Sequence, residues 1–153
     1  MAKALTHVFI SYDGLTDPLG QSQVMPYLLG LAAKGHSLTL LSFEKAHRQD
    51  DMDSVRQRLT QAGIAWKPLT YRQGPRGTWS NLREGKAVLK ELWTEQDIGC
   101  IHCRGHHMTL LLGRYLWRLS HSPILYDLRG FWADERFDSG TWSRWNPVHR
   151  VAY

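Results

Sequence analysis

Short apolar runs alternate with amphipathic segments along almost the whole of this chain. The runs are five to eight residues long and are bounded by glycine, proline or polar clusters; they lie at 7–11, 37–43, 64–71, 98–103 and 123–128. Helical periodicity fills the intervals, at 24–34, 55–62, 80–96 and 108–120. Strands and helices that alternate in this way form parallel sheets covered on both faces, with right-handed crossovers. The sequence therefore predicts a mainly parallel, three-layer α/β/α sandwich with the strand order 3-2-1-4-5.

Length and hydropathy restrict the class of protein. A chain of 153 residues fits one domain that buries a substantial core. A bilayer-spanning helix needs roughly 18 apolar residues, and the longest candidate run, 108–117, is interrupted by Arg114. The N-terminus leads straight into a strand without the apolar region of a secretory signal. We expect a cytoplasmic protein.

The formal net charge of +5 favours an anionic partner. Nucleic acid, an anionic membrane face and phosphorylated substrates all meet that description. The basic residues form no block of like charge, which argues against a nucleic-acid-binding arm. Trp132, Trp142 and Trp145 fit either a peripheral contact with the inner membrane face or contact with a further domain, and we expect the second.

The segment CIHCRGHHM at 100–108 has the residue types of a zinc site. However, strand alternation directs Cys100 and Cys103 to opposite faces of the sheet, and no second pair of ligands lies elsewhere. We therefore expect buried strand cysteines, with neither a metal nor another cofactor.

Ligands of open parallel sheets bind at the carboxyl ends of the strands, which selects the loops at 12–22, 44–49, 104–108 and 128–142. The first loop, DGLTDPLGQSQ, precedes a helix, where free N–H groups and the helix dipole favour an anion. Its glycine spacing fits neither the dinucleotide fingerprint nor a P-loop, so an ordinary turn between strand and helix is the alternative.

Two blocks of the sequence resemble parts of a known family. Residues 10–45, ISYDGLTDPLGQSQVMPYLLGLAAKGHSLTLLSFEK, resemble the N-terminal domain of family 4 glycosyltransferases, which are retaining enzymes of the GT-B fold. Residues 127–142, DLRGFWADERFDSGTW, resemble a stretch that follows the fifth strand in one branch of that family. The resemblance implies that residues 1–153 form one Rossmann-like, acceptor-side domain, the N-terminal half of a GT-B enzyme.

The full enzyme would transfer a sugar from a nucleotide diphosphate donor to a glycan or lipid-linked acceptor, as in polysaccharide biosynthesis. The family holds the donor with a Glu-x7-Glu pair in the C-terminal domain. No two glutamates of this chain are eight residues apart: they are Glu44, Glu84, Glu91, Glu95 and Glu135. We therefore expect the donor-binding domain to lie outside this chain, and the chain alone to be inactive.

The resemblance also suggests substrate-binding residues in the first loop and after strand four. Gly20 and Gln21 stand where many relatives have two adjacent glycines that contact the donor diphosphate or the acceptor, and Asp17 belongs to the same loop. Relatives often end strand four with His-x-His, and here the second position is Arg104. A guanidinium can hold a phosphate or carboxylate with two parallel hydrogen bonds. Arg104 and His106 are the candidate catalytic residues, and a solvated loop arginine is the alternative for Arg104.

The loop after strand five interleaves charged and aromatic side chains, which suits a sugar. Arg129, Asp134 and Glu135 are the candidate substrate-binding residues there. A salt-bridged loop that closes the end of the sheet is the alternative. We expect Asp134 or Glu135 to pair with Arg104 and Arg129 in the absence of ligand.

A non-catalytic, flavodoxin-like binding or regulatory module is the alternative for the whole chain. Receivers of that kind carry a phosphoacceptor aspartate at the end of strand three, where this chain has Leu69-Thr70-Tyr71. The glycosyltransferase interpretation is therefore favoured.

Overall fold

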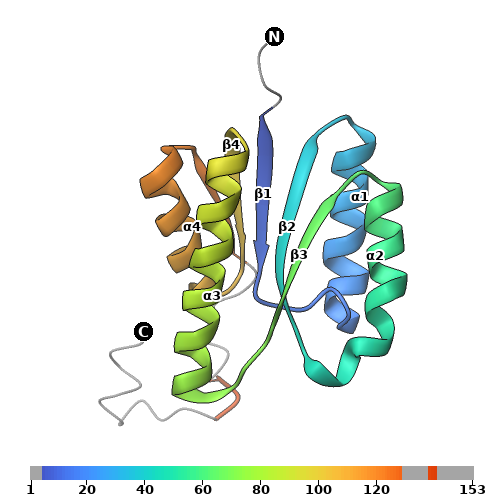
Figure 1. The fold of residues 1–153 in the computed structure, drawn as a ribbon. Coiled ribbons are helices and arrows are strands. Elements are labelled where there is room, and N and C mark those ends of the chain that lie inside the picture. The colour runs from blue at the N-terminus through green and yellow to red at the C-terminus, as the bar shows by residue number, and fades with distance from the viewer. Residues whose placement is uncertain (1–4, 129–137, 141–153) are drawn as a thin grey trace.

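The computed structural model describes residues 5–128 and 138–140, and it has five parallel strands in one sheet. The strands are β1 (Thr6–Ser11), β2 (Ser37–Glu44), β3 (Ala65–Thr70), β4 (Ile98–Arg104) and β5 (Ile124–Asp127). Their order, β3-β2-β1-β4-β5, is the predicted one (Figure 1). The order reverses between β1 and β4, and ligands bind beside such a reversal in open α/β sheets.

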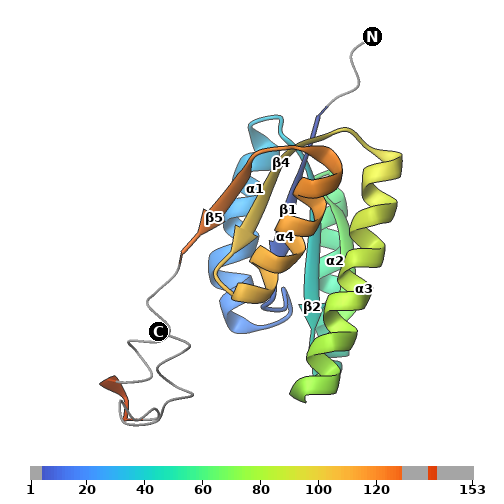
Figure 2. The same cartoon turned by 90° about the vertical axis from the view of Figure 1, so that its left-hand side faces the viewer.

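Four helices form the outer layers: α1 (Met25–Ala33), α2 (Met52–Gln61), α3 (Gly74–Glu95) and α4 (His107–Ser120). A π-helical turn, Gly20–Val24, leads into α1, and a 3-10 turn, Ala46–Asp51, leads into α2. Helices α1 and α2 cover one face of the sheet, and α3 and α4 cover the other (Figures 1 and 2). None of these helices combines the length and apolarity needed to cross a membrane.

Side chains that alternate along the central strands fill two cores, one on each face. Val8 and Ile10 of β1 pack toward α3 and α4, whereas Phe9 packs toward α1 and α2. The runs FIS and LTLLSF can be rich in apolar residues because a parallel strand is buried on both faces. The predicted helix 24–34 and its stop at Gly35, which has a φ of 87°, are confirmed.

Helix α3 begins six residues earlier than the predicted start at 80. Pro75 stands in the first turn of α3. Backbone N–H groups in a first turn have no partner within the helix, so a proline there costs no hydrogen bond. Asn81 is buried inside this helix. Its side chain donates to the Arg72 carbonyl and to the Tyr12 hydroxyl, both at 2.9 Å, and so fastens the chain after β3 to the end of β1.

Candidate functional site

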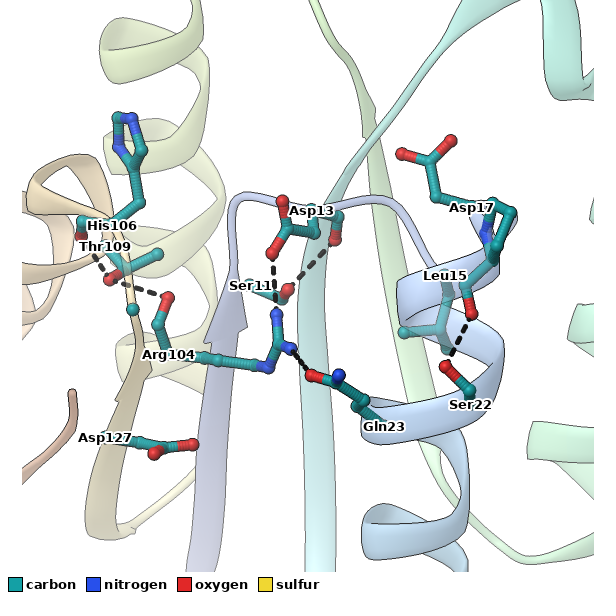
Figure 3. Close-up of polar contacts among 12 residues, drawn as sticks. Ser11, Asp13, Leu15, Asp17, Ser22, Gln23, Arg104, His106, Thr109 and Asp127 are labelled. Carbon is teal, nitrogen blue, oxygen red and sulfur yellow. Dashed lines mark hydrogen bonds and ion pairs between the residues drawn. The ribbon is translucent and has the colours of Figure 1, made fainter. Parts of the chain in front are cut away.

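Arg104 is the last residue of β4 and lies at the reversal of strand order, beside Ser11 of β1. Only 4% of its surface is exposed. Its Nη1 donates to Asp13 Oδ2 at 2.6 Å, and its Nη2 donates to Gln23 Oε1 at 2.8 Å (Figure 3). Its Nε is buried without a hydrogen-bond partner among the described residues. The interpretation of Arg104 as a solvated loop arginine is therefore wrong, because the side chain is almost fully buried. A buried guanidinium needs hydrogen-bond partners that compensate for the lost water, and Asp13 and Gln23 supply them.

Asp13 was not singled out by the sequence, although it directly follows the strand beside Arg104. Its side chain is 53% exposed, so a half-solvated carboxylate covers a buried guanidinium. The expected counter-ions, Asp134 and Glu135, lie outside the described residues, as does Arg129. Within the described part of the chain, Asp13 supplies the negative charge at Arg104.

The π-helical turn brings Gln23 to the guanidinium. A π turn adds a residue to the helical ring, which changes the direction of the side chains that follow, and such turns are frequent at functional sites. Gln21, in the same turn, donates from Nε2 to the Leu15 carbonyl at 2.6 Å and accepts from Arg58 Nη1 at 2.8 Å. Gln21 therefore fastens the loop to helices α1 and α2.

The carboxylate of Glu44, the last residue of β2, accepts hydrogen bonds from the loop between β1 and α1. Glu44, only 6% exposed, accepts hydrogen bonds from the backbone N–H groups of Leu15 and Thr16, at 2.8 and 3.0 Å. It also accepts from the hydroxyls of Thr16 and Ser42, at 2.7 and 2.6 Å. Two backbone amides of the loop thus bind a carboxylate of the chain itself, and the anion site expected at the start of the helix stays a prediction.

The other candidates in this loop have structural contacts. Gly20 lies against the backbone of Gly14 and Leu15, where a Cβ would collide with the Gly14 carbonyl. The N–H of Gln21 donates to the Asp17 carbonyl at 2.9 Å. The Asp17 carboxylate is paired with Lys45 at 2.9 Å. Gly20, Gln21 and Asp17 therefore shape the loop, and Asp17 lies apart from the pair formed by Asp13 and Arg104 (Figure 3).

His106 caps α4 at the same edge of the sheet. Its Nδ1 accepts from the N–H of Met108 at 3.1 Å, and its ring stacks on Tyr12 with centroids 4.6 Å apart. Burial and, to a smaller extent, the charge of His107 lower the pKa of His106 to about 4, and Asp13 partly opposes this shift. The ring is therefore neutral at pH 7, and because Nδ1 accepts, the proton is on Nε2.

Both cysteines are free thiols: Cys103 is buried in the core under α3 and α4, as expected, whereas Cys100 is only partly buried. Cys103 packs closely against Gly113 of α4, and burial raises the pKa of its thiol to about 12. Between residues 5 and 128, no three histidine, cysteine, aspartate or glutamate side chains are grouped so that they could hold a metal ion.

Comparison with known proteins shows the fold alone. No family model matches the chain, and no curated protein matches its sequence. A crystal structure of the C-terminal domain of a hydrogenase from Pyrococcus furiosus matches with 18% identity and a TM-score of 0.59, covering 84% of this chain and 94% of that domain. A second structure of that domain matches with 14% identity and a TM-score of 0.58, covering 82% and 93%.

A Listeria monocytogenes protein named as a UDP-N-acetylglucosamine 2-epimerase also shares the fold. It matches with 14% identity and a TM-score of 0.55, and the match covers 91% of this chain and 34% of that protein. This chain therefore spans about a third of the Listeria protein. The matches establish a Rossmann-like α/β domain, a fold that hosts many unrelated functions.

Proposed function

We propose that this chain is the acceptor-side domain of a GT-B glycosyltransferase. In the proposed enzyme a second α/β domain holds a nucleotide diphosphate sugar, and this domain holds a glycan or lipid-linked acceptor. The observation that carries the proposal is the buried Arg104 at the reversal of strand order, covered by the exposed carboxylate of Asp13. The resemblance of residues 10–45 to the family and the Rossmann-like fold of the named epimerase support it.

Arg104 is suited to hold an anionic group of the substrate. Displacement of Asp13 would free Nη1, and Nη2 beside it, which donates one N–H to Gln23, has a second N–H to offer to the same group. Phosphate and carboxylate accept two parallel hydrogen bonds from a guanidinium. Exchange of one anion for another avoids leaving the buried positive charge without a partner.

His106 is suited to contact sugar hydroxyls. It is neutral at pH 7, so it donates from Nε2 without adding a positive charge beside Arg104. The stacked Tyr12 and the bond to Met108 fix the orientation of the ring. His106 would therefore position a hydroxyl or a developing oxyanion, and its low pKa excludes it as the proton donor at neutral pH.

The test is sugar transfer by the complete gene product, assayed with a panel of labelled nucleotide sugars and lipid or glycan acceptors. Replacement of Arg104 by alanine should lower turnover at least tenfold, which corresponds to about 1.4 kcal/mol. Arg104→Lys keeps the charge but loses the paired geometry, and it should fall between the alanine variant and wild type. Thermal unfolding of each variant separates loss of contact from loss of fold.

A second measurement tests whether the nucleotide sugar binds to the other domain of the proposed enzyme. Calorimetric titration of residues 1–153 with the same nucleotide sugars should give no micromolar binding, because the glutamate pair is absent from this chain. Micromolar binding to any of them would contradict the proposed division. Absence of transfer by the complete gene product with every donor would favour a non-catalytic, flavodoxin-like module instead.

A further inference from the structure

A row of basic and indole side chains runs along the outer surface of α3. Its members recur at alternating spacings of three and four residues, which places them on one face of a helix: Arg76, Trp79, Arg83, Lys86, Lys90 and Trp93. At 1.5 Å per residue the row is about 25 Å long. We call it the α3 row.

Both indoles of the α3 row face solvent. The exposed fractions are 63% for Trp79 and 40% for Trp93, values that are unusual for the largest apolar side chain. The Arg83 guanidinium lies 5.2 Å from the ring centroid of Trp79. Charged groups and apolar rings therefore share one surface, and neither tryptophan belongs to the core.

Helix α4 extends this surface sideways. The ammonium of Lys86 lies 5.5 Å from the ring centroid of Tyr115, so the α3 row borders the side of α4 that carries Tyr115. One turn away on that side is Leu111, 49% exposed, and one turn in the other direction is Arg118, also exposed. The three residues of α4 and the α3 row together form what we call the basic-aromatic surface.

Among the described residues of α3 and α4, no acidic side chain lies within the basic-aromatic surface, since the glutamates of α3 fall outside the three-and-four spacing. Glu84 is paired with Arg72 at 2.7 Å, and Glu91 is offset from the row. On the other face of the sheet, α2 mixes Asp53 with Arg56 and Arg58 and exposes no large apolar side chain, and α1 exposes Tyr27 at 44%. On the α3 row, positive charge and two exposed indoles therefore occur together.

We propose that the basic-aromatic surface docks on a membrane that contains anionic lipids, independently of the function proposed above. Lysine and arginine attract anionic headgroups, while tryptophan and leucine enter the boundary between headgroups and acyl chains. A second copy of this chain would set like charges against each other. A nucleic acid would use the indoles for stacking but would gain nothing from Leu111.

The experiment is co-sedimentation of the 153-residue chain with phosphatidylcholine vesicles, with and without phosphatidylglycerol. We expect binding only to the anionic vesicles, weakened by added salt. Arg83→Glu combined with Lys90→Glu should weaken binding more than tenfold. The matched control combines Lys34→Glu with Arg56→Glu, which removes the same charge from exposed positions of the other face and should leave binding within twofold.

The indoles are tested separately. Trp79→Ala combined with Trp93→Ala should weaken binding at least fivefold and abolish the blue shift of tryptophan fluorescence on anionic vesicles. Trp117→Ala, an exposed indole outside the surface, should do neither. Equal losses in both charge pairs, no binding to anionic vesicles, or tighter binding to single-stranded oligouridylate at the same salt would each overturn the proposal. If the charge-reversed pair does not fold by circular dichroism, the indole pair decides.

Discussion

At the residue scale, the low pKa of His106 makes stability depend on pH. As the pH falls, His106 takes up a proton around pH 4 in the folded protein, because its pKa is about 4 there. An unfolded histidine takes one up around pH 6.5. Between these values the unfolded state holds more protons, so stability should fall as pH falls from 6.5 to 4, and it should be unaffected by this group above 6.5. Urea unfolding at a series of pH values measures the loss.

His106→Asn is the matched variant, because asparagine can still accept from the N–H of Met108 but does not titrate. Its stability should lack the part of the decline between pH 6.5 and 4 that His106 causes. His47→Asn, at an exposed position, should keep the wild-type decline. A His106 ring that titrates near pH 6.5 by NMR would contradict the expectation.

The sequence predicted which strand ends carry the candidate residues but not how the side chains pair. Arg104 and His106 lie at the carboxyl edge because strand periodicity fixes where β4 ends. The contacts of Asp13 and Gln23 with Arg104 could not be predicted from the sequence, because they depend on the path of a loop and on a π turn. Neither feature has a periodic signature in the sequence.

At the element scale, the loop between β1 and α1 takes its shape from Glu44. Replacement of Glu44 by glutamine places an amide N–H₂ among groups that donate hydrogen bonds. We expect the free energy of unfolding to fall by about 2 kcal/mol, since buried donors lose their acceptor. The loop should also become more sensitive to thermolysin at Leu15 and Leu19. Urea unfolding and timed proteolysis measure the two effects.

Glu91→Gln is the control for this change, because Glu91 is exposed on α3 and its replacement should alter stability by less than about 0.5 kcal/mol. If Glu44→Gln behaved like the control, the loop would owe its shape to its glycines rather than to the carboxylate.

Element ends were predicted unevenly from the sequence. The stops of α1 and α2 follow from Gly35 and Gly63, both at positive φ, and were read correctly. The start of α3 is predicted six residues too late, because the composition Gly74, Pro75 and Gly77 is typical of a loop. The close contact of Gly77 with the backbone of Arg72 explains that composition, since a Cβ at this position would lie 2.7 Å from the Arg72 carbonyl.

At the scale of the whole molecule, two cores share the central strands. Leu40 belongs to the core under α1 and α2, and Leu89 belongs to the core under α3 and α4. Leu40→Ala and Leu89→Ala should each lower the free energy of unfolding by about 2–5 kcal/mol. Because both cores rest on the same sheet, urea transitions followed by circular dichroism and by fluorescence should remain coincident.

Leu110→Ala, on the exposed side of α4, should have little effect on stability. Two separated transitions in either core variant would show that the faces unfold independently. The overall topology itself was predictable, because alternation and the handedness of crossovers leave few arrangements for five parallel strands.

The contact between Asp13 and Arg104 joins residues that are 91 positions apart. On the ribosome, β1, β2 and β3 emerge with the helices between them and can pair through short connections. The edge of β1 that receives β4 then stays open until Arg104 has left the exit tunnel. Contacts of such long sequence separation form slowly. We therefore expect the pairing of β1 with β4, and with it the contact between Asp13 and Arg104, to form later during synthesis than the pairing of β1, β2 and β3. The exposed edge of β1 should be where the nascent chain is most open to chaperones.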